Sequence, residues 1–375
     1  MSDPTTTVIY GETHTHPSGG PGRFLSGVGT IVALELRQRV KGTAAWVLLG
    51  VFVVLVGLVT AFSWIALNGF DPERGSGVGV YSVVIFFVLL LGTLVTPALS
   101  GNAINGDRDA GTLATTQVTL ITTGQLLLGK FIAAWITALA FLAASVPFIL
   151  VALFSGEIQI ETILVSLLVL AVELGVVAAV GVGLSGVISK PLFSIVTTYL
   201  IVAALSVGTL IAFSLGGMAN QSTIRSTYIP FVFPEDGSEP TECGEPEVTE
   251  YQVPRFDYFW GALSANPYVI LADASPSTYE SDGNGQDLFT HLKCGVRASQ
   301  FAPDLDITYS DCDPRINSQG FPGGYKSSQE LIENSVPSWF VGLSIHLALA
   351  IGLMALAWRR VRTPARKLSK GSRIA

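Results

Sequence analysis

Long apolar runs dominate the pattern along the chain, and six of them carry almost no charge. A helix needs about 20 apolar residues to cross the ~30 Å hydrocarbon core of a bilayer, and soluble helices seldom stay apolar on every face for so long. We therefore predict an all-α polytopic membrane protein with six transmembrane helices. The predicted spans are residues 44–67, 78–101, 131–154, 160–188, 193–218 and 339–358.

Polar segments precede, separate and follow these spans. Residues 1–25 are rich in Thr, Gly and Pro, which is typical of a disordered tail. Residues 26–42 favour an amphipathic helix on the membrane surface, with Ile31 and Leu34 in the interface and Glu35 and Arg39 toward water. Flanking charge that only sets orientation would explain the same residues. The expected organisation is a tail at 1–25, an interfacial helix at 26–42, spans one to five at 43–218 with a loop at 102–130, an insert at 219–335, span six at 336–360 and a basic tail at 361–375.

Charge is scarce and unevenly distributed. Only 13% of the residues are charged and the mean hydropathy is +0.54, whereas soluble proteins carry about 25% charged residues. Residues 218–335 hold 18 acidic and 6 basic residues, a balance of −12, and the rest holds 10 acidic and 15 basic residues, a balance of +5. Because basic residues gather in cytoplasmic segments, we predict a multi-pass protein of the cell membrane with cytoplasmic N- and C-termini and an extracytoplasmic segment at 219–335.

The insert at 219–335 contains no span and is dense in Pro, Gly, Ser and acidic residues, with aromatic residues between them. This composition predicts mixed, partly irregular structure with short strands. Within it, residues 257–274 read as an amphipathic segment that rests on the outer membrane surface.

All three cysteines, Cys243, Cys294 and Cys312, fall in the insert. An oxidising exterior permits disulfides, so we expect one bond and one remaining thiol, and the spacing leaves all three pairings open. A metal site that combines cysteine with His291 lacks the usual CxxC spacing. His14 and His16 lack a third ligand nearby, and we expect no metal site.

Catalytic patterns are weak throughout the chain. Residues 124–130 formally match a phosphate loop, but Phe131 stands where a Ser or Thr would bind magnesium, and no strand precedes them. Residues 184–186 echo part of an ATP-binding cassette signature but lie at the end of an apolar span. The four histidines are scattered, so no nucleophile has a visible base. We expect no catalytic residue, no cofactor bound by this chain and no nucleic-acid partner.

Two polar residues inside the predicted spans invite a functional reading. Glu173 lies in the middle of the fourth span, where an unpaired carboxylate is costly and must face the protein interior or a cavity. It could contact a substrate, couple to protons or form a hydrogen bond between helices. His346 in the sixth span is either a packed neutral histidine or a functional one.

The loop between the second and third spans carries the most specific pattern. An acidic–Arg pair at Asp107 and Arg108 is followed by Gly111, Thr112 and Leu113, and then by a Leu-Leu-Gly-Lys run at 127–130 that enters the third span. This pattern resembles the ABC-2 type transporter permease family. Residues 183–190 are similar to that family's turn between spans four and five, and the basic C-terminal tail is similar to that of its actinobacterial members.

The resemblance implies a permease subunit of an ATP-driven exporter for an amphipathic substrate such as a drug, a lipid or a lipid-linked molecule. In this family the segment after span two is a coupling helix that docks on a separate cytoplasmic ATPase subunit, which binds ATP and Mg. Asp107, Arg108, Thr112 and Leu113 match its positions. The resemblance also implies pairing with a second permease subunit through spans two and five. Small residues in span five would permit close packing: Ala203, Ala204, Ser206 and Gly208.

Two other functions stay open. The insert is longer than in polysaccharide or simple drug exporters of the family and is closer to the NosY-like branch, so the chain could be a membrane receptor or scaffold that presents the insert without transport. A secondary transporter would show inverted repeats and ion ligands at the midplane. We see no convincing repeat, and Glu173 is the one acidic residue in the middle of a span.

Overall fold

The computed structural model describes residues 21–68, 77–111, 121–154, 156, 158–232, 242–312 and 327–361. Within these residues, six helical segments are long and apolar enough to cross a membrane, as predicted. They are α2 (Thr43–Asn68), α3 (Gly77–Ser100), α6 with α7 (Thr123–Ala144, Val146–Phe154), α8 (Ile160–Val187), α9 with the π-helical η2 and α10 (Pro191–Ala203, Ala204–Gly208, Thr209–Ala219), and α16 (Trp339–Val361).

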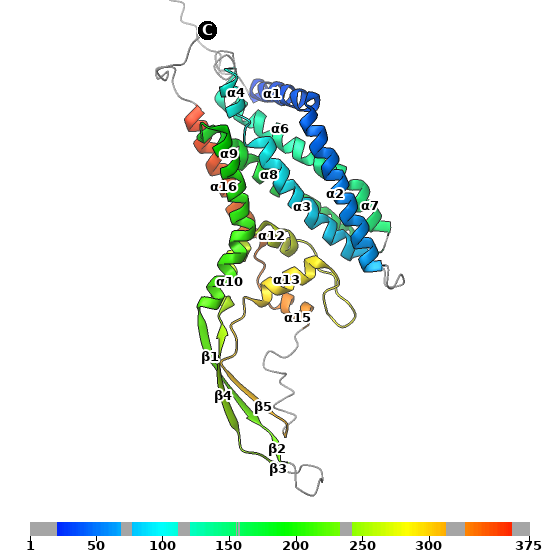
Figure 1. Cartoon of the computed structure of the whole chain (residues 1–375), viewed down its shortest axis with the longest axis vertical. Coiled ribbons are helices and arrows are strands. Elements are labelled where there is room, and N and C mark those ends of the chain that lie inside the picture. Colours follow the sequence, from blue (N-terminus) through cyan, green and yellow to red (C-terminus); the bar gives the residue numbers. More distant parts are fainter. Residues whose placement is uncertain are drawn as a thin grey trace, which may run out of the picture.

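Helix α8 is the centre of the bundle and contacts α3, α6, α9 and α16 (Figure 1). Its second half is rich in Gly, Ala and Val, and these small residues let neighbouring backbones approach closely. A Cβ atom on Gly183 would lie 2.9 Å from the Cβ of Leu353, and one on Gly186 would lie 2.6 Å from the Cβ of Ala357. The close packing of α8 on α16 therefore depends on glycine at both positions.

The N-terminal helix α1 (Pro21–Lys41) packs along α6, which corrects two expectations. The helix starts at Pro21, so the disordered tail cannot extend to residue 25. Ile31 is buried against Gly129 of α6 rather than lying in the interface with lipid. Arg39 donates to the carbonyl oxygen of Leu99 at 3.2 Å, so it faces the bundle and not water, and burial lowers the pKa of its guanidinium.

The third span starts earlier than the apolar pattern indicated. Thr122 and Gln125 form a reciprocal capping box that satisfies backbone groups at the start of α6. Residues 124–130, which formally match a phosphate loop, are therefore helical. The loop expected at 102–130 ends before Thr123, and its last eight residues belong to α6.

The insert contains a small mixed sheet, as its composition predicted. The strand order is β4–β1–β5: β1 (Gln221–Ile229) pairs antiparallel with β4 (Glu247–Pro254) and parallel with β5 (Asp306–Ser310). A second ribbon joins β2 (Phe231–Val232) to β3 (Glu242–Cys243). The strands extend from the end of α10, at the opposite end of the molecule from α1 and the short helix α4 (Asn105–Asp109) (Figure 1).

Helices of the insert fill the space between the sheet and the spans. They are the 3-10 turn η3 (Phe256–Tyr258), α11 (Trp260–Ser264), α12 (Pro267–Ala274), α13 (Leu288–Ala298) and α15 (Ser328–Glu333). Ile270 and Leu271 of α12 are fully buried in one apolar cluster with residues of α3 and α8. The expectation that 257–274 rests on the membrane surface is therefore wrong for α12, which packs inside the bundle.

A buried carboxylate joins the insert to the sixth span. Asp273 Oδ1 accepts a hydrogen bond from Arg297 Nε of α13 at 2.7 Å, and Oδ2 accepts from the backbone N–H groups of Ser338 at 2.7 Å and Trp339 at 3.0 Å. Those two N–H groups stand at the start of α16, where helical donors lack partners within the helix. Asp273 thus caps a transmembrane helix from a different part of the chain.

The arginine in this arrangement extends the connection. Arg297 also donates to the carbonyl oxygen of Ile332 at the end of α15, so α12, α13, α15 and α16 meet at one ion pair. The neighbouring Lys293 donates to the carbonyl oxygen of Ser275 at 2.5 Å. Burial lowers the pKa of Lys293 to about 8, and the carboxylate of Asp273 opposes that shift.

The structure selects one of the three possible cysteine pairings. Cys243 of β3 and Cys312, just after β5, form a disulfide with a Cα–Cα distance of 5.9 Å, within the usual range. Cys294 of α13 is a free thiol. The bond ties the β2–β3 ribbon to the three-stranded sheet.

Maleimide labelling of the unfolded full chain should therefore modify one cysteine without reductant and three after reduction. Digestion should place the first label on Cys294, and Cys294→Ser should abolish labelling under non-reducing conditions. A first label on Cys243 or Cys312 in protein from an oxidising compartment would contradict the pairing.

Candidate functional site

Helix α4 lies directly after the second span and carries Asp107 and Arg108, two of the four residues expected at a coupling helix. A backbone turn at 101–104 separates it from α3, and Gly111 ends it with a φ of 70°, a conformation that L side chains rarely adopt. Thr112 and Leu113 lie outside the described residues. The part of the predicted coupling segment that the structure describes is therefore a short helix at one end of the bundle.

Lys130 ties α4 to the two helices beside it. Its Nζ lies 2.7 Å from Asp107 Oδ2 of α4 and also forms an ion pair with Glu35 of α1. The Lys130 side chain is only 2% exposed, whereas Asp107 is 30% exposed. A buried ammonium between two carboxylates is a favourable arrangement because both partners reduce the cost of its desolvation.

Hydrogen bonds also fix α4 to the end of α8. The Ser185 hydroxyl accepts from the backbone N–H groups of Ile104 at 2.9 Å and Asn105 at 3.1 Å. The Asn105 side chain donates to the carbonyl oxygen of Ile188 and accepts a hydrogen bond from Arg108 at 2.6 Å. A displacement of α4 would thus act on α1, α6 and α8 together.

The sequence pattern located α4 but not its partners. Glu35 was expected to face water, and Lys130 was noted only as part of the motif that enters span three. Their separation along the chain gives no sign of contact, because the ion pair arises only when α1 folds back along α6. Ser185 belonged to a false nucleotide-binding signature and in fact supports α4.

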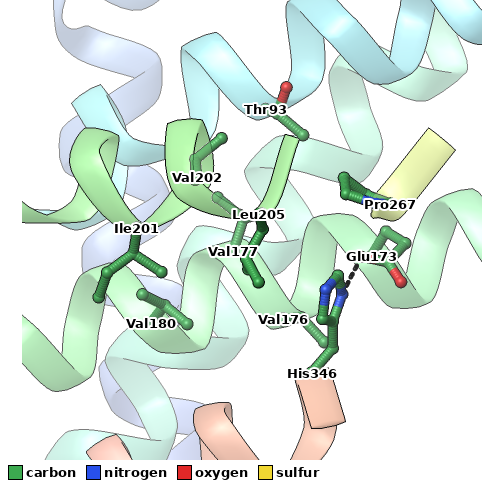
Figure 2. Close-up of a pocket in the computed structure, with 10 residues that line it drawn as sticks. All are labelled: Thr93, Glu173, Val176, Val177, Val180, Ile201, Val202, Leu205, Pro267 and His346. Atoms are coloured by element: carbon green, nitrogen blue, oxygen red, sulfur yellow. Dashed lines mark hydrogen bonds and ion pairs between the residues drawn. The ribbon is translucent and has the colours of Figure 1, made fainter. Parts of the chain in front are cut away.

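A second polar site lies inside the bundle, between spans four and six. His346 Nδ1 of α16 is 2.8 Å from Glu173 Oε2 of α8, and each side chain is 1% exposed (Figure 2). The other ring nitrogen, Nε2, lies 2.9 Å from the carbonyl oxygen of Ala265 in the insert. The two residues that were singled out separately therefore form one site.

The partners determine where the protons of this pair reside. A carbonyl oxygen only accepts hydrogen bonds, so Nε2 of His346 carries a proton and donates it to Ala265. A second proton must then lie between Nδ1 and Glu173 Oε2, on either atom. Whichever atom holds it, the pair as a whole is electrically neutral. A neutral pair is the form that a low-dielectric interior tolerates best.

Glu173 and His346 line a partly open, narrow recess (Figure 2). One wall is α8 and the other is the fifth span, where the π-helical stretch η2 begins. Thr93 and Pro267 complete it. Apart from the polar pair and Thr93, the lining is apolar: Val176, Val177, Val180, Ile201, Val202, Leu205 and Pro267.

No group of three or more His, Cys, Asp or Glu residues that could hold a metal ion occurs among the described residues. Cys294 is the one free cysteine of that part of the chain, and His14 and His16 lie outside it. The chemistry of the two sites is thus ion pairing and hydrogen bonding.

Comparison with models of known protein families gives no match, and a search of curated proteins finds no similar sequence. The functional proposal below therefore depends on the pattern at 102–130 and on the geometry of the α4 site.

Proposed function

We propose that the chain is the permease subunit of an ATP-driven exporter of the ABC-2 type, which moves an amphipathic substrate across the cytoplasmic membrane. The observation that carries this proposal is the attachment of α4 to three membrane-facing helices through Lys130 and Ser185. A separate cytoplasmic ATPase subunit would hydrolyse ATP with Mg. The permease itself would convert movement of that subunit into movement of its spans.

The arrangement of the ends supports the proposed orientation. Helices α1 and α4 and the end of α16 lie at one end of the molecule, and the sheet lies at the other (Figure 1). The first end carries Arg359 and Arg360 and leads into the basic tail. The second carries the disulfide, which suits an oxidising exterior. We therefore propose cytoplasmic termini and an extracytoplasmic insert.

Rigid attachment explains how force would pass through α4. An ATPase that pushes on α4 meets no flexible link, because the ion pair of Asp107 with Lys130 moves α6 and the Ser185 hydrogen bonds move α8. Packed helices change position as rigid bodies more readily than they deform. The spans that surround the central α8 would therefore shift together and alter access across the membrane.

A second permease subunit would pair with the fifth span. Only 6% of the apolar window of that span is buried within the chain, against 56% for span two. Large apolar side chains of span five, including Leu200 and Ile211, are exposed and available to a partner or to lipid. Span two already packs against α7, α8 and α9, so span five offers more free surface for pairing.

Alanine at Arg108 or Leu113 should weaken association with the ATPase subunit about 30-fold, because truncation of an interface anchor costs about 2 kcal/mol. The measurement is the affinity of the purified full chain for the ATPase encoded beside it, together with ATP-dependent export. Glu280→Ala, an exposed acidic residue of the insert, is the matched control and should leave both unchanged.

Two results would contradict the proposal. One is a wild-type chain with which no ATPase subunit co-purifies. The other is export that continues unchanged when Asp107, Arg108 and Leu113 are all replaced. Either outcome would favour the receptor or scaffold function, for which α4 needs no docking partner.

A further inference from the structure

The recess beside Glu173 holds an unsatisfied acceptor. Glu173 Oε2 is engaged by His346, but Oε1 has no hydrogen-bond partner although the side chain is 1% exposed. A buried carboxyl oxygen without a partner costs about 1–3 kcal/mol, so such groups are rare unless something outside the chain satisfies them. Glu173 is one of the residues that line the recess, which places this acceptor at a site open to a ligand.

The opposite wall is also unusual. The fifth span changes from α-helix to π-helix over Ala204–Gly208, directly where Leu205 lines the recess. Single π-helical turns inside α-helices occur frequently at functional sites. The Ser206 hydroxyl in this turn is a second buried group without a partner, and Asn266, beside Pro267, donates to the Ser206 carbonyl oxygen.

The charge of the site restricts what it can bind. The Glu173–His346 pair is neutral as a whole, so a cation in the recess would have no counter-charge of its own and would be costly at this depth. An anion would meet an oxygen acceptor. An uncharged hydroxyl or amide N–H, in contrast, can donate to Oε1 while an attached apolar chain contacts the valine-rich walls.

We propose that this recess binds the hydroxyl or amide end of an uncharged amphiphile, with Glu173 Oε1 as the acceptor and the apolar walls around the adjoining chain. The narrow inner part accommodates a small donor group, and the open side lets the chain continue outward. The same chemistry is offered by a resident membrane lipid with a free hydroxyl and by an exported amphiphile. This site does not depend on the coupling role of α4.

Photolabelling of the full chain in lipid nanodiscs tests the proposal. The probe is a long-chain alcohol with a diazirine near the hydroxyl, compared with a matched alkane and a matched alkylammonium that carry the same diazirine. Mass spectrometry counts labels on peptides from residues 173–180 and 201–205. The alcohol should label them about fivefold more than the alkane, the gain expected from one good hydrogen bond.

Matched variants separate the parts of the site. Glu173→Gln should retain the alcohol preference, because its NH2 group can donate to His346 Nδ1 and its carbonyl oxygen remains an acceptor. Glu173→Leu should abolish the preference. Leu205→Trp should block labelling by filling the recess while leaving the polar pair intact. Leu210→Trp is its control, five residues further along the same span and 48% exposed.

Several outcomes would overturn the proposal. Equal labelling by alcohol and alkane would mean that Oε1 needs no ligand donor. Stronger labelling by the ammonium, lost in Glu173→Gln, would mean that the site binds cations. Retained alcohol preference in Leu205→Trp would place the ligand elsewhere. Because the ATPase is absent, none of these results depends on coupling.

The source of the amphiphile can be separated in the same system. Alcohol labelling that falls when the ATPase and ATP are supplied identifies the bound molecule as cargo. Labelling that stays constant under those conditions identifies a resident lipid. Both results support the site, whereas loss of the alcohol preference on addition of the ATPase without ATP would indicate labelling of an unpaired surface and would contradict it.

Discussion

Asp273→Ala should lower the free energy of unfolding by about 3–5 kcal/mol, the cost of breaking a buried ion pair by removing one partner. The substitution leaves Arg297, whose side chain is 7% exposed, without its carboxylate. It also removes the acceptor for the first N–H groups of α16, at Ser338 and Trp339. Thermal or chemical unfolding of the full chain in detergent measures the loss.

Two further variants make this result specific. Asp273→Asn keeps an oxygen that can accept from Ser338 and Trp339 but cannot neutralise Arg297, so it should fall between wild type and Asp273→Ala. Asp304→Ala, at an exposed acidic position of the same insert, should change stability by less than about 0.5 kcal/mol. An Asp273→Ala protein as stable as Asp304→Ala would show that the insert is not attached to the sixth span in this way.

Lys130→Met should cost about 2–4 kcal/mol and release α1 and α4 from the bundle. Methionine preserves most of the volume but leaves Glu35 and Asp107 facing each other without the ammonium. The expected cost lies below that of a fully buried pair because Asp107 is 30% exposed and water screens it. Unfolding in detergent gives the energy, and amide hydrogen exchange should become faster in α1 and α4 before other helices.

A double-mutant cycle tests whether this effect comes from the ion pairs. Glu35→Gln in the Lys130→Met background should cost less than Glu35→Gln in wild type, because the interaction is already lost. Arg37→Gln, on the same helix, should be additive with Lys130→Met. Unchanged exchange in α1 and α4, or additivity for Glu35, would mean that Lys130 does not hold these helices.

The membrane segments could be predicted because their signal is local. A run of about 20 apolar residues excludes most other structures, whatever the rest of the chain does. The structure changed mainly their ends: a capping box at Thr122 extends the third span toward its N-terminus, and Pro21 opens a helix inside the expected tail. Caps depend on side-chain geometry rather than on hydropathy, which is why the apolar pattern misplaced them.

The insert shows the limit of composition. Its mixed structure was predicted, but the burial of α12 was not, because Ile270 and Leu271 read equally well as a face toward lipid and as a face toward α3 and α8. The disulfide was also undetermined, since three cysteines allow three pairings until the strands bring Cys243 beside Cys312.

The sites divide in the same way. Sequence alone identified Asp107 and Arg108 through a motif, and Glu173 and His346 because polar groups inside spans are expensive and must find a partner. It could not join Glu173 to His346, since 173 positions separate them. Nor could it join Lys130 to Glu35.

Sequence by itself determined the six spans, the polar insert and the few polar residues that needed an explanation, because apolar length and isolated charge are properties of a short stretch of chain. Only the tertiary structure decided which polar groups meet, which acceptor on Glu173 remains open, and that Asp273 caps the sixth span. Such contacts depend on the distances between helices far apart in sequence, and those distances are set by the packing of small residues on α8.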